Sequence, residues 1–243
     1  MHTIELPDGR TTRPGTPLLV DDPYFRAVLR TLELVTPITD HHRPRVADLG
    51  CLEGGFAAGF AQAGYETVGI EGRSVNFEKC QYLADQLALA NLTYVQDDIR
   101  NLEHYGEFDA VFCAGVLYHL DEPVSFLHLL GRLARRLLLV QTHYAPTHDD
   151  YEFHALSPLC TNEGKLGRWF EEEEQDPWAA IGNRRSFWLT KRDLLQSLVD
   201  AGFPMICEQF DFLDQIGEND YNEKHSRGLF LGIKAPATRG LER

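Results

Sequence analysis

The chain has 243 residues, 43% of them hydrophobic, and a formal net charge of −14 at pH 7. This length can bury one sizeable core, so we expect a single domain over residues 1–243. The negative charge disfavours nonspecific nucleic-acid binding, although a local basic patch for one structured RNA stays open.

Other features of the composition narrow the class of protein further. No apolar run approaches the roughly 20 residues that span a bilayer, and the first residues lack the apolar core of a signal peptide. We therefore expect a cytoplasmic protein that does not contact a membrane. The 5 cysteines show neither a CxxC pair nor zinc-ligand spacing, so we expect them to be reduced and mostly buried.

Strand-like and helix-like segments alternate after residue 44. The hydrophobic pattern predicts strands at 45–49, 66–71, 92–96, 108–115 and 137–142. It predicts helices at 54–64, 75–90 and 122–135. Strands that alternate with helices of this length indicate right-handed crossovers and a parallel sheet with helices on both faces. We predict an α/β core at 45–142, preceded by a capping segment at 1–44.

The alternation stops at residue 142 and returns only near residue 189. Residues 143–188 form an insert without a clear period, which we expect to act as a lid over a ligand pocket. A helix then begins after Thr190 as N-cap and ends near Gly202. Strand-like segments at 205–212 and 228–234 are separated by a polar loop, which indicates a hairpin.

The stretch VADLGCLEGGFA, residues 46–57, places a glycine turn between a buried strand and a helix. This arrangement lets backbone N–H groups approach a nucleotide closely. A phosphate-binding P-loop is disfavoured because Phe56 and Ala57, instead of Lys and Ser or Thr, follow the last glycine. The glycine spacing also differs from the GxGxxG pattern of dinucleotide folds.

The pattern DxGCxxG in this turn resembles the first motif of class I S-adenosylmethionine-dependent methyltransferases. The resemblance implies a Rossmann-like, seven-stranded, mostly parallel sheet with an antiparallel last strand, and S-adenosylmethionine as cofactor. It also implies that Glu71 accepts both ribose hydroxyls and that Asp98, or alternatively Asp97, takes the adenine amino group beside the backbone of Ile99. The fourth strand, which ends near Ala114, matches the family strand that faces the reacting methyl group. The cofactor residues implied in this way are Asp48, Gly50, Cys51, Gly54, Glu71, Gly72, Asp97, Asp98, Ile99 and Ala114.

The chemistry of the cofactor agrees with an acidic, lysine-free turn. S-adenosylmethionine carries a sulfonium, an ammonium, a diol and an adenine amino group but no phosphate, so it favours hydrogen-bond acceptors. Leu52 departs from the family pattern because this position is usually glycine. We expect its backbone to be tolerated with a negative φ, and its side chain to narrow the approach to the amino-acid half of the cofactor.

Candidate catalytic residues follow the fourth and fifth predicted strands, because ligands of such sheets lie at the carboxyl ends of the strands. His143 is the favoured general base, since histidine accepts a proton near neutrality, although a loop histidine bonded to a carbonyl is the alternative. Tyr118 and His119 are the other candidates. His119 resembles the histidine of the GVLYH motif in bacterial methyltransferases and in tRNA wobble-uridine carboxymethyl-transfer enzymes.

The insert carries possible metal ligands and acceptor-binding side chains. His148, Asp149 and Asp150 are candidates for holding a magnesium ion, with a solvated loop as the alternative. Aromatic faces suit sugar rings and arginine pairs grip carboxylate or phosphate, while the alternative is a lid that packs its apolar residues onto the sheet. The acceptor-binding candidates are Tyr24, Tyr144, Arg184 and Trp188.

The favoured hypothesis is methylation of a hydroxyl on a small polar acceptor, a sugar or glycoside, with a histidine base and a divalent cation as a candidate helper. The alternative is a tRNA-directed methyl or carboxymethyl transfer, which the acidic composition and the lack of a basic module disfavour. A third reading is a non-enzymatic scaffold that retains the cofactor fold. Both a monomer and a homodimer remain open.

Overall fold

A computed structural model of the protein describes residues 2–148, 156–171, 181–213 and 226–234. The helices are α1 (Pro23–Val35), α2 (Gly55–Gln62), α3 (Ser74–Leu87), α4 (Pro123–Leu133) and α5 (Lys191–Asp200). Short 3-10 turns are η1 (Leu19–Asp21), η2 (Ile99–Tyr105) and η3 (Leu117–His119). The strands are β1 (Arg45–Leu49), β2 (Glu66–Ile70), β3 (Leu92–Val95), β4 (Phe108–Ala114), β5 (Ala134–His143), β6 (Cys160–Asn162), β7 (Lys165–Glu171), β8 (Arg185–Leu189), β9 (Met205–Gln209) and β10 (Arg227–Ile233).

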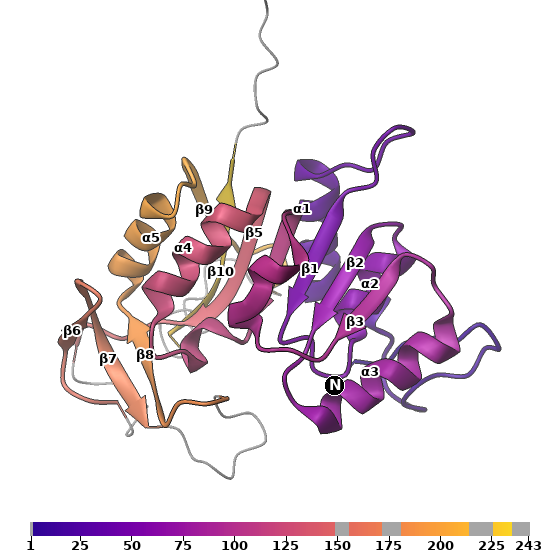
Figure 1. The fold of residues 1–243 in the computed structure, drawn as a ribbon, viewed down its shortest axis with the longest axis horizontal. Coiled ribbons are helices and arrows are strands. Elements are labelled where there is room, and N and C mark those ends of the chain that lie inside the picture. Colours follow the sequence, from indigo (N-terminus) through magenta and orange to yellow (C-terminus); the bar gives the residue numbers. More distant parts are fainter. Residues whose placement is uncertain (1, 149–155, 172–180, 214–225, 235–243) are drawn as a thin grey trace, which may run out of the picture.

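The main sheet has seven strands in the order β3-β2-β1-β4-β5-β10-β9 (Figure 1). Strands β1 to β5 pair in parallel, whereas β10 pairs antiparallel with both β5 and β9. The Rossmann-like sheet with an antiparallel last strand is therefore confirmed. Because the parallel strands run in the same direction, their carboxyl ends meet at one edge, where the chain order reverses between β1 and β4.

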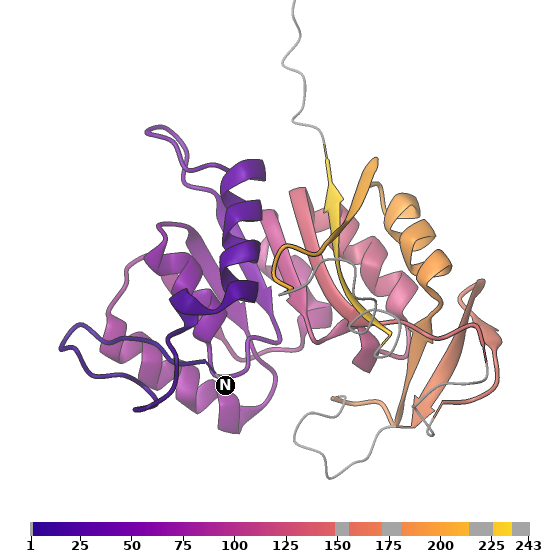
Figure 2. The ribbon, with the colours of Figure 1, turned by 180° about the vertical axis from the view of Figure 1, so that it is seen from behind.

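Helices cover both faces of the sheet, as predicted (Figures 1 and 2). Alternate residues along the strands enter two apolar clusters: Val46 packs with α1, α2 and α3, whereas Ala47 packs with α4 and α5. Both of these side chains are fully buried, which is why the strands read as nearly continuous apolar runs. Among the described residues, no helix is long and apolar enough to cross a membrane.

The sequence pattern missed α1, the helix of the N-terminal segment. Its start is well specified, because the Asp22 side chain accepts the backbone N–H groups of Tyr24 and Phe25, and Pro23 occupies the first helical position. The cap predicted at Thr190 is confirmed, since its hydroxyl accepts the N–H of Asp193 at the start of α5.

The insert contains a separate antiparallel sheet, β6-β7-β8, which the sequence pattern did not reveal. It lies beside α4 and α5 (Figure 1). Arg168 of β7 is 1% exposed and donates to the carbonyls of Pro146, His148 and Ser157. This buried guanidinium ties the connection after β5 to the small sheet. The lid role of the insert stays a prediction.

Candidate cofactor and acceptor site

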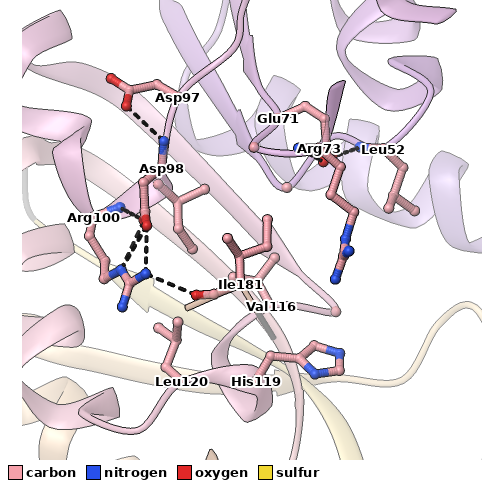
Figure 3. A pocket seen from close by; sticks show the side chains of 14 residues that line it. Leu52, Glu71, Arg73, Asp97, Asp98, Arg100, Val116, His119, Leu120 and Ile181 are labelled. Carbon is pink, nitrogen blue, oxygen red and sulfur yellow. Dashed lines mark hydrogen bonds and ion pairs between the residues drawn. The ribbon is translucent and has the colours of Figure 1, made fainter. Parts of the chain in front are cut away.

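A cavity lies at the carboxyl ends of β1 to β4, where ligands of such sheets bind. Figure 3 shows Glu71, Asp98 and His119 on three sides of it. The lining residues are Gly50, Leu52, Glu71, Gly72, Arg73, Asp97, Asp98, Ile99, Arg100, Gly115, Val116, His119, Leu120 and Ile181.

The glycine turn after β1 requires its glycines. Gly50 has φ +64°, and a Cβ there would lie 2.7 Å from Val116 Cγ2. Gly54 has φ +82°, and a Cβ there would lie 2.5 Å from the hydroxyl of Tyr94, which donates to the Gly54 carbonyl. Gly54 precedes α2 and is not among the cavity-lining residues, so its described contacts are those of a turn.

The expectation of a negative φ at Leu52 is wrong, because this residue has φ +53°. A β-carbon in the left-handed region costs on the order of 1–2 kcal/mol. Hydrogen bonds offset this cost: Leu52 N–H donates to Glu71, and the Cys80 thiol donates to the Leu52 carbonyl. The side chain nevertheless lines the cavity, as expected for a residue that narrows the approach.

Glu71 follows β2 and is 3% exposed. Its Oε2 accepts the N–H of Leu52 at 2.9 Å, and its Oε1 accepts the N–H of Arg73 at 2.8 Å. Each carboxylate oxygen has a further lone pair, so the group keeps acceptor capacity for two hydroxyls of a ligand. The two backbone bonds fix the carboxylate in the cavity wall.

Asp97 and Asp98 follow β3, and their carboxylates have different partners. Asp97 accepts hydrogen bonds from Tyr105 and Asn101, which lower its pKa. Asp98 is partly buried, but the hydrogen bonds and charge of Arg100 outweigh that burial and hold its pKa below the usual value. Asp97 therefore braces the η2 turn, whereas Asp98 forms an ion pair in the cavity wall (Figure 3).

Asp48 is buried at the end of β1 and accepts the N–H of Ala57 at 2.9 Å. Burial, with a smaller contribution from the charge of Glu71, raises the pKa of Asp48 to about 7. A ligand that brings positive charge to this side chain would favour its ionised form.

A second cavity adjoins the first and shares Gly50, Leu52, Arg73, Gly115 and His119 with it. It extends toward β5 and β10. Its other lining residues are His2, Tyr24, Asp48, Cys51, Phe56, Ala114, Tyr118, Gln141 and Arg227.

The predicted catalytic residues are close together but face different surroundings. His119 lines both cavities, and Tyr118 lines the second. His143 is not among the described lining residues: its ring stacks on Trp188 at 4.9 Å and meets the Tyr118 ring edge-on at 4.8 Å. Trp188 Nε1 also donates to the Tyr118 carbonyl at 2.9 Å. His143 and Trp188 thus support the η3 turn through their contacts with Tyr118.

Of the predicted acceptor-binding residues, Tyr24 lines the second cavity. Trp188 and Tyr144 are buried in contacts with neighbouring rings, and Arg184 is exposed. The predicted magnesium ligands Asp149 and Asp150 lie outside the described residues. His148 is described, and its carbonyl accepts from Arg168. The described part of the chain holds no cluster of three metal-ligating side chains.

The polar lining residues that the sequence reasoning did not name as candidates include His2, Arg73, Arg100, Gln141 and Arg227. Arg73 and Arg100 had a local signal, because each follows a predicted cofactor acid by two residues. His2 and Arg227 lie in segments far from the motifs.

Comparison with known proteins gives a consistent picture. Residues 46–137 match the family model of a methyltransferase domain. The tRNA U34 carboxymethyltransferase of Campylobacter hominis is 32% identical over 96 residues, which are 39% of this chain and 33% of that protein. The ubiquinone biosynthesis O-methyltransferase of Acinetobacter baylyi is 29% identical over 93 residues, which are 37% of this chain and 39% of that protein.

The structural likeness extends further along the chain. The N-terminal domain of EvdMO1 has been solved in the presence of D-fucose and S-adenosylhomocysteine (SAH), the cofactor without its methyl group. Its TM-score is 0.69 at 26% identity, and the match covers 94% of this chain and 88% of that domain. The matched region and the fold are those of a methyltransferase domain, and proteins of similar fold have been solved with S-adenosylmethionine or its demethylated product bound. This chain matches only 33% to 50% of the length of the curated relatives.

Proposed function

We propose that the chain transfers the methyl group of S-adenosylmethionine to a hydroxyl of a small polar acceptor, with a sugar or glycoside as the acceptor class. The observation that carries this proposal is the pair of adjoining cavities, which share five residues including His119. In this proposal, the adenosine half of the cofactor occupies the first cavity, while its amino-acid half and the acceptor share the second. The methyl group is then transferred at their junction.

The residues of the first cavity suit the cofactor. Glu71 would accept the ribose hydroxyls, and Asp98 beside Ile99 would meet the adenine ring. Asp48, on the side of the second cavity, would meet the positive charge of the amino-acid half. When bound, the cofactor supplies an electrophilic methyl group, and the chain's task is to orient the acceptor and remove a proton.

The proposed base is His119. The sequence favours His143, but the geometry supports His119 better. His119 lines both cavities, whereas His143 stacks against the Trp188 ring and lines neither of them in the described part of the chain. In this proposal His143 is a positioning residue that holds the Tyr118 ring.

A sugar as acceptor is supported by the D-fucose with which the EvdMO1 domain was solved. The test is transfer of a tritiated methyl group from S-adenosylmethionine to a panel of sugars, hydroxy acids and tRNA, with and without EDTA. We expect label on a sugar or hydroxy acid. Label on tRNA alone would favour the alternative function, which the tRNA-modifying relatives support. No label on any compound would contradict both.

A further inference from the structure

Arg227 presents a buried donor at the wall of the second cavity. It begins β10 and pairs with His143 of β5. Its Nη2 donates to Gln141 Oε1 at 2.7 Å, which orients the guanidinium. Its Nε is buried and has no hydrogen-bond acceptor within the part of the chain that the structure describes. Because the Arg227 side chain is only partly buried and lines the cavity, a ligand there would meet the remaining N–H groups of its guanidinium.

The place of Arg227 in the sheet assigns that ligand to the acceptor side. Strand β10 lies three positions from β1 in the order β1-β4-β5-β10, which is roughly 14 Å at the usual strand spacing. Glu71 and Asp98 follow β2 and β3, on the opposite side of β1. Arg227 is therefore far from the wall that would hold the adenosine.

The charge of the second cavity contrasts with that of the whole chain. The protein carries −14, yet the described lining of this cavity has two arginines, Arg73 and Arg227, and one carboxylate, the buried Asp48. The Tyr118 ring lies 5.9 Å from Arg227 Cζ, so an aromatic hydroxyl-bearing side chain flanks the same spot. An oriented guanidinium with an available N–H is suited to a planar carboxylate.

We propose that Arg227 binds a carboxylate of the acceptor, so that the acceptor is a sugar acid and not a neutral sugar. This inference rests on the proposed function, which it makes more specific. The ring and its hydroxyls would lie toward His119, while the carboxylate would lie at β10.

The test uses sugars that share a ring and differ at C6. D-galacturonate and D-fucose form one pair, and D-glucuronate and D-glucose form a second. D-galactose 6-phosphate and D-glucose 6-phosphate are the third set. Their affinities for the SAH-loaded protein are measured by titration calorimetry. We expect an acid to bind at least tenfold more tightly than its neutral partner, and Arg227→Gln to reduce that ratio to about threefold or less.

Arg136→Gln is the matched control, because Arg136 also has a buried Nε without an acceptor among the described residues but lines a different cavity. This variant should keep the preference for the acid. Three results would each overturn the inference. The acids and the neutral sugars could bind with equal affinity, a phosphate could bind best and through Arg227, or Arg227→Gln could lose affinity for SAH. Failure of the wild-type protein to bind SAH would instead overturn the proposed function.

Discussion

The two cavities that adjoin at His119 are built differently. Apart from Ile181, every described residue lining the first cavity lies between Gly50 and Leu120. The second cavity brings together residues from His2 to Arg227. The first is thus a product of successive turns at the ends of neighbouring parallel strands, and the second depends on the packing of the whole domain.

This difference has a physical cause. Backbone N–H groups of the turns after β1 and β2 fix the first two acids: Ala57 donates to Asp48, and Leu52 and Arg73 donate to Glu71. On the acceptor side, Tyr118 is held by Trp188 of β8, and Gln141 of β5 orients Arg227 of β10. The cofactor side should therefore be robust to changes elsewhere, whereas the acceptor side should respond to changes in the insert.

The largest expected effect is that of removing the imidazole at the junction. His119→Ala should lower kcat by roughly 100-fold to 10,000-fold, the usual contribution of a general base, while SAH affinity changes little. The matched control is His143→Gln, which should lower kcat by less than about tenfold because His143 only positions Tyr118. A larger loss of kcat in the His143 variant would mean that His143 is the general base.

Next in size is the loss of the fixed acid of the first cavity. Glu71→Gln should weaken SAH binding by about 1.5–3 kcal/mol, the range for hydrogen bonds to a charged group. Titration calorimetry measures the change, and Glu66→Gln at the exposed start of β2 serves as the control. Unchanged SAH affinity would mean that the ribose does not lie against Glu71.

The raised pKa of Asp48 predicts a pH dependence. Because the folded apo protein holds a proton on Asp48 up to about pH 7, cationic cofactor should release it, and affinity for S-adenosylmethionine should rise by up to about tenfold between pH 6 and 8. The free energy of unfolding of the apo protein should change in the opposite direction and fall as pH rises. The stabilisation that Asp48 contributes is fully present below about pH 4, the pKa of the unfolded chain, and is lost as pH rises through 7. Asp48→Asn should flatten both profiles, and a profile that keeps its slope in this variant would assign the titration to another group.

The smallest effects distinguish the two acids after β3. Asp98→Asn should weaken SAH binding by about threefold to tenfold, the size of one hydrogen bond. Asp97→Asn should mainly lower the free energy of unfolding, by about 1 kcal/mol, because its carboxylate braces Tyr105 and Asn101. Thermal unfolding and SAH titration of both variants separate the roles, and a reversal of the two patterns would assign the adenine contact to Asp97.

The part of the molecule that could be predicted from the sequence is the part specified locally. Periodicity predicted β1 to β5, and the turn DxGCxxG led to Glu71 and Asp98, both of which line the first cavity. Leu52 was misjudged because its positive φ depends on tertiary hydrogen bonds to Glu71 and Cys80.

The acceptor side could not be predicted in the same way. Arg227 has no neighbouring motif, and only the antiparallel pairing of β10 with β5 brings it to Gln141. The strands of the insert are short or have mixed burial, so their hydrophobic period is weak. That small sheet nevertheless supplies Trp188, which holds the η3 turn in place.

A crystal structure of the protein with SAH bound tests the central claim most directly. We expect both ribose hydroxyls within hydrogen-bonding distance of the Glu71 carboxylate, the adenine beside Asp98 and Ile99, and the sulfur facing the cavity that holds His119. A nucleoside bound elsewhere, or in the opposite direction with its sulfur away from His119, would contradict the assignment of the two cavities.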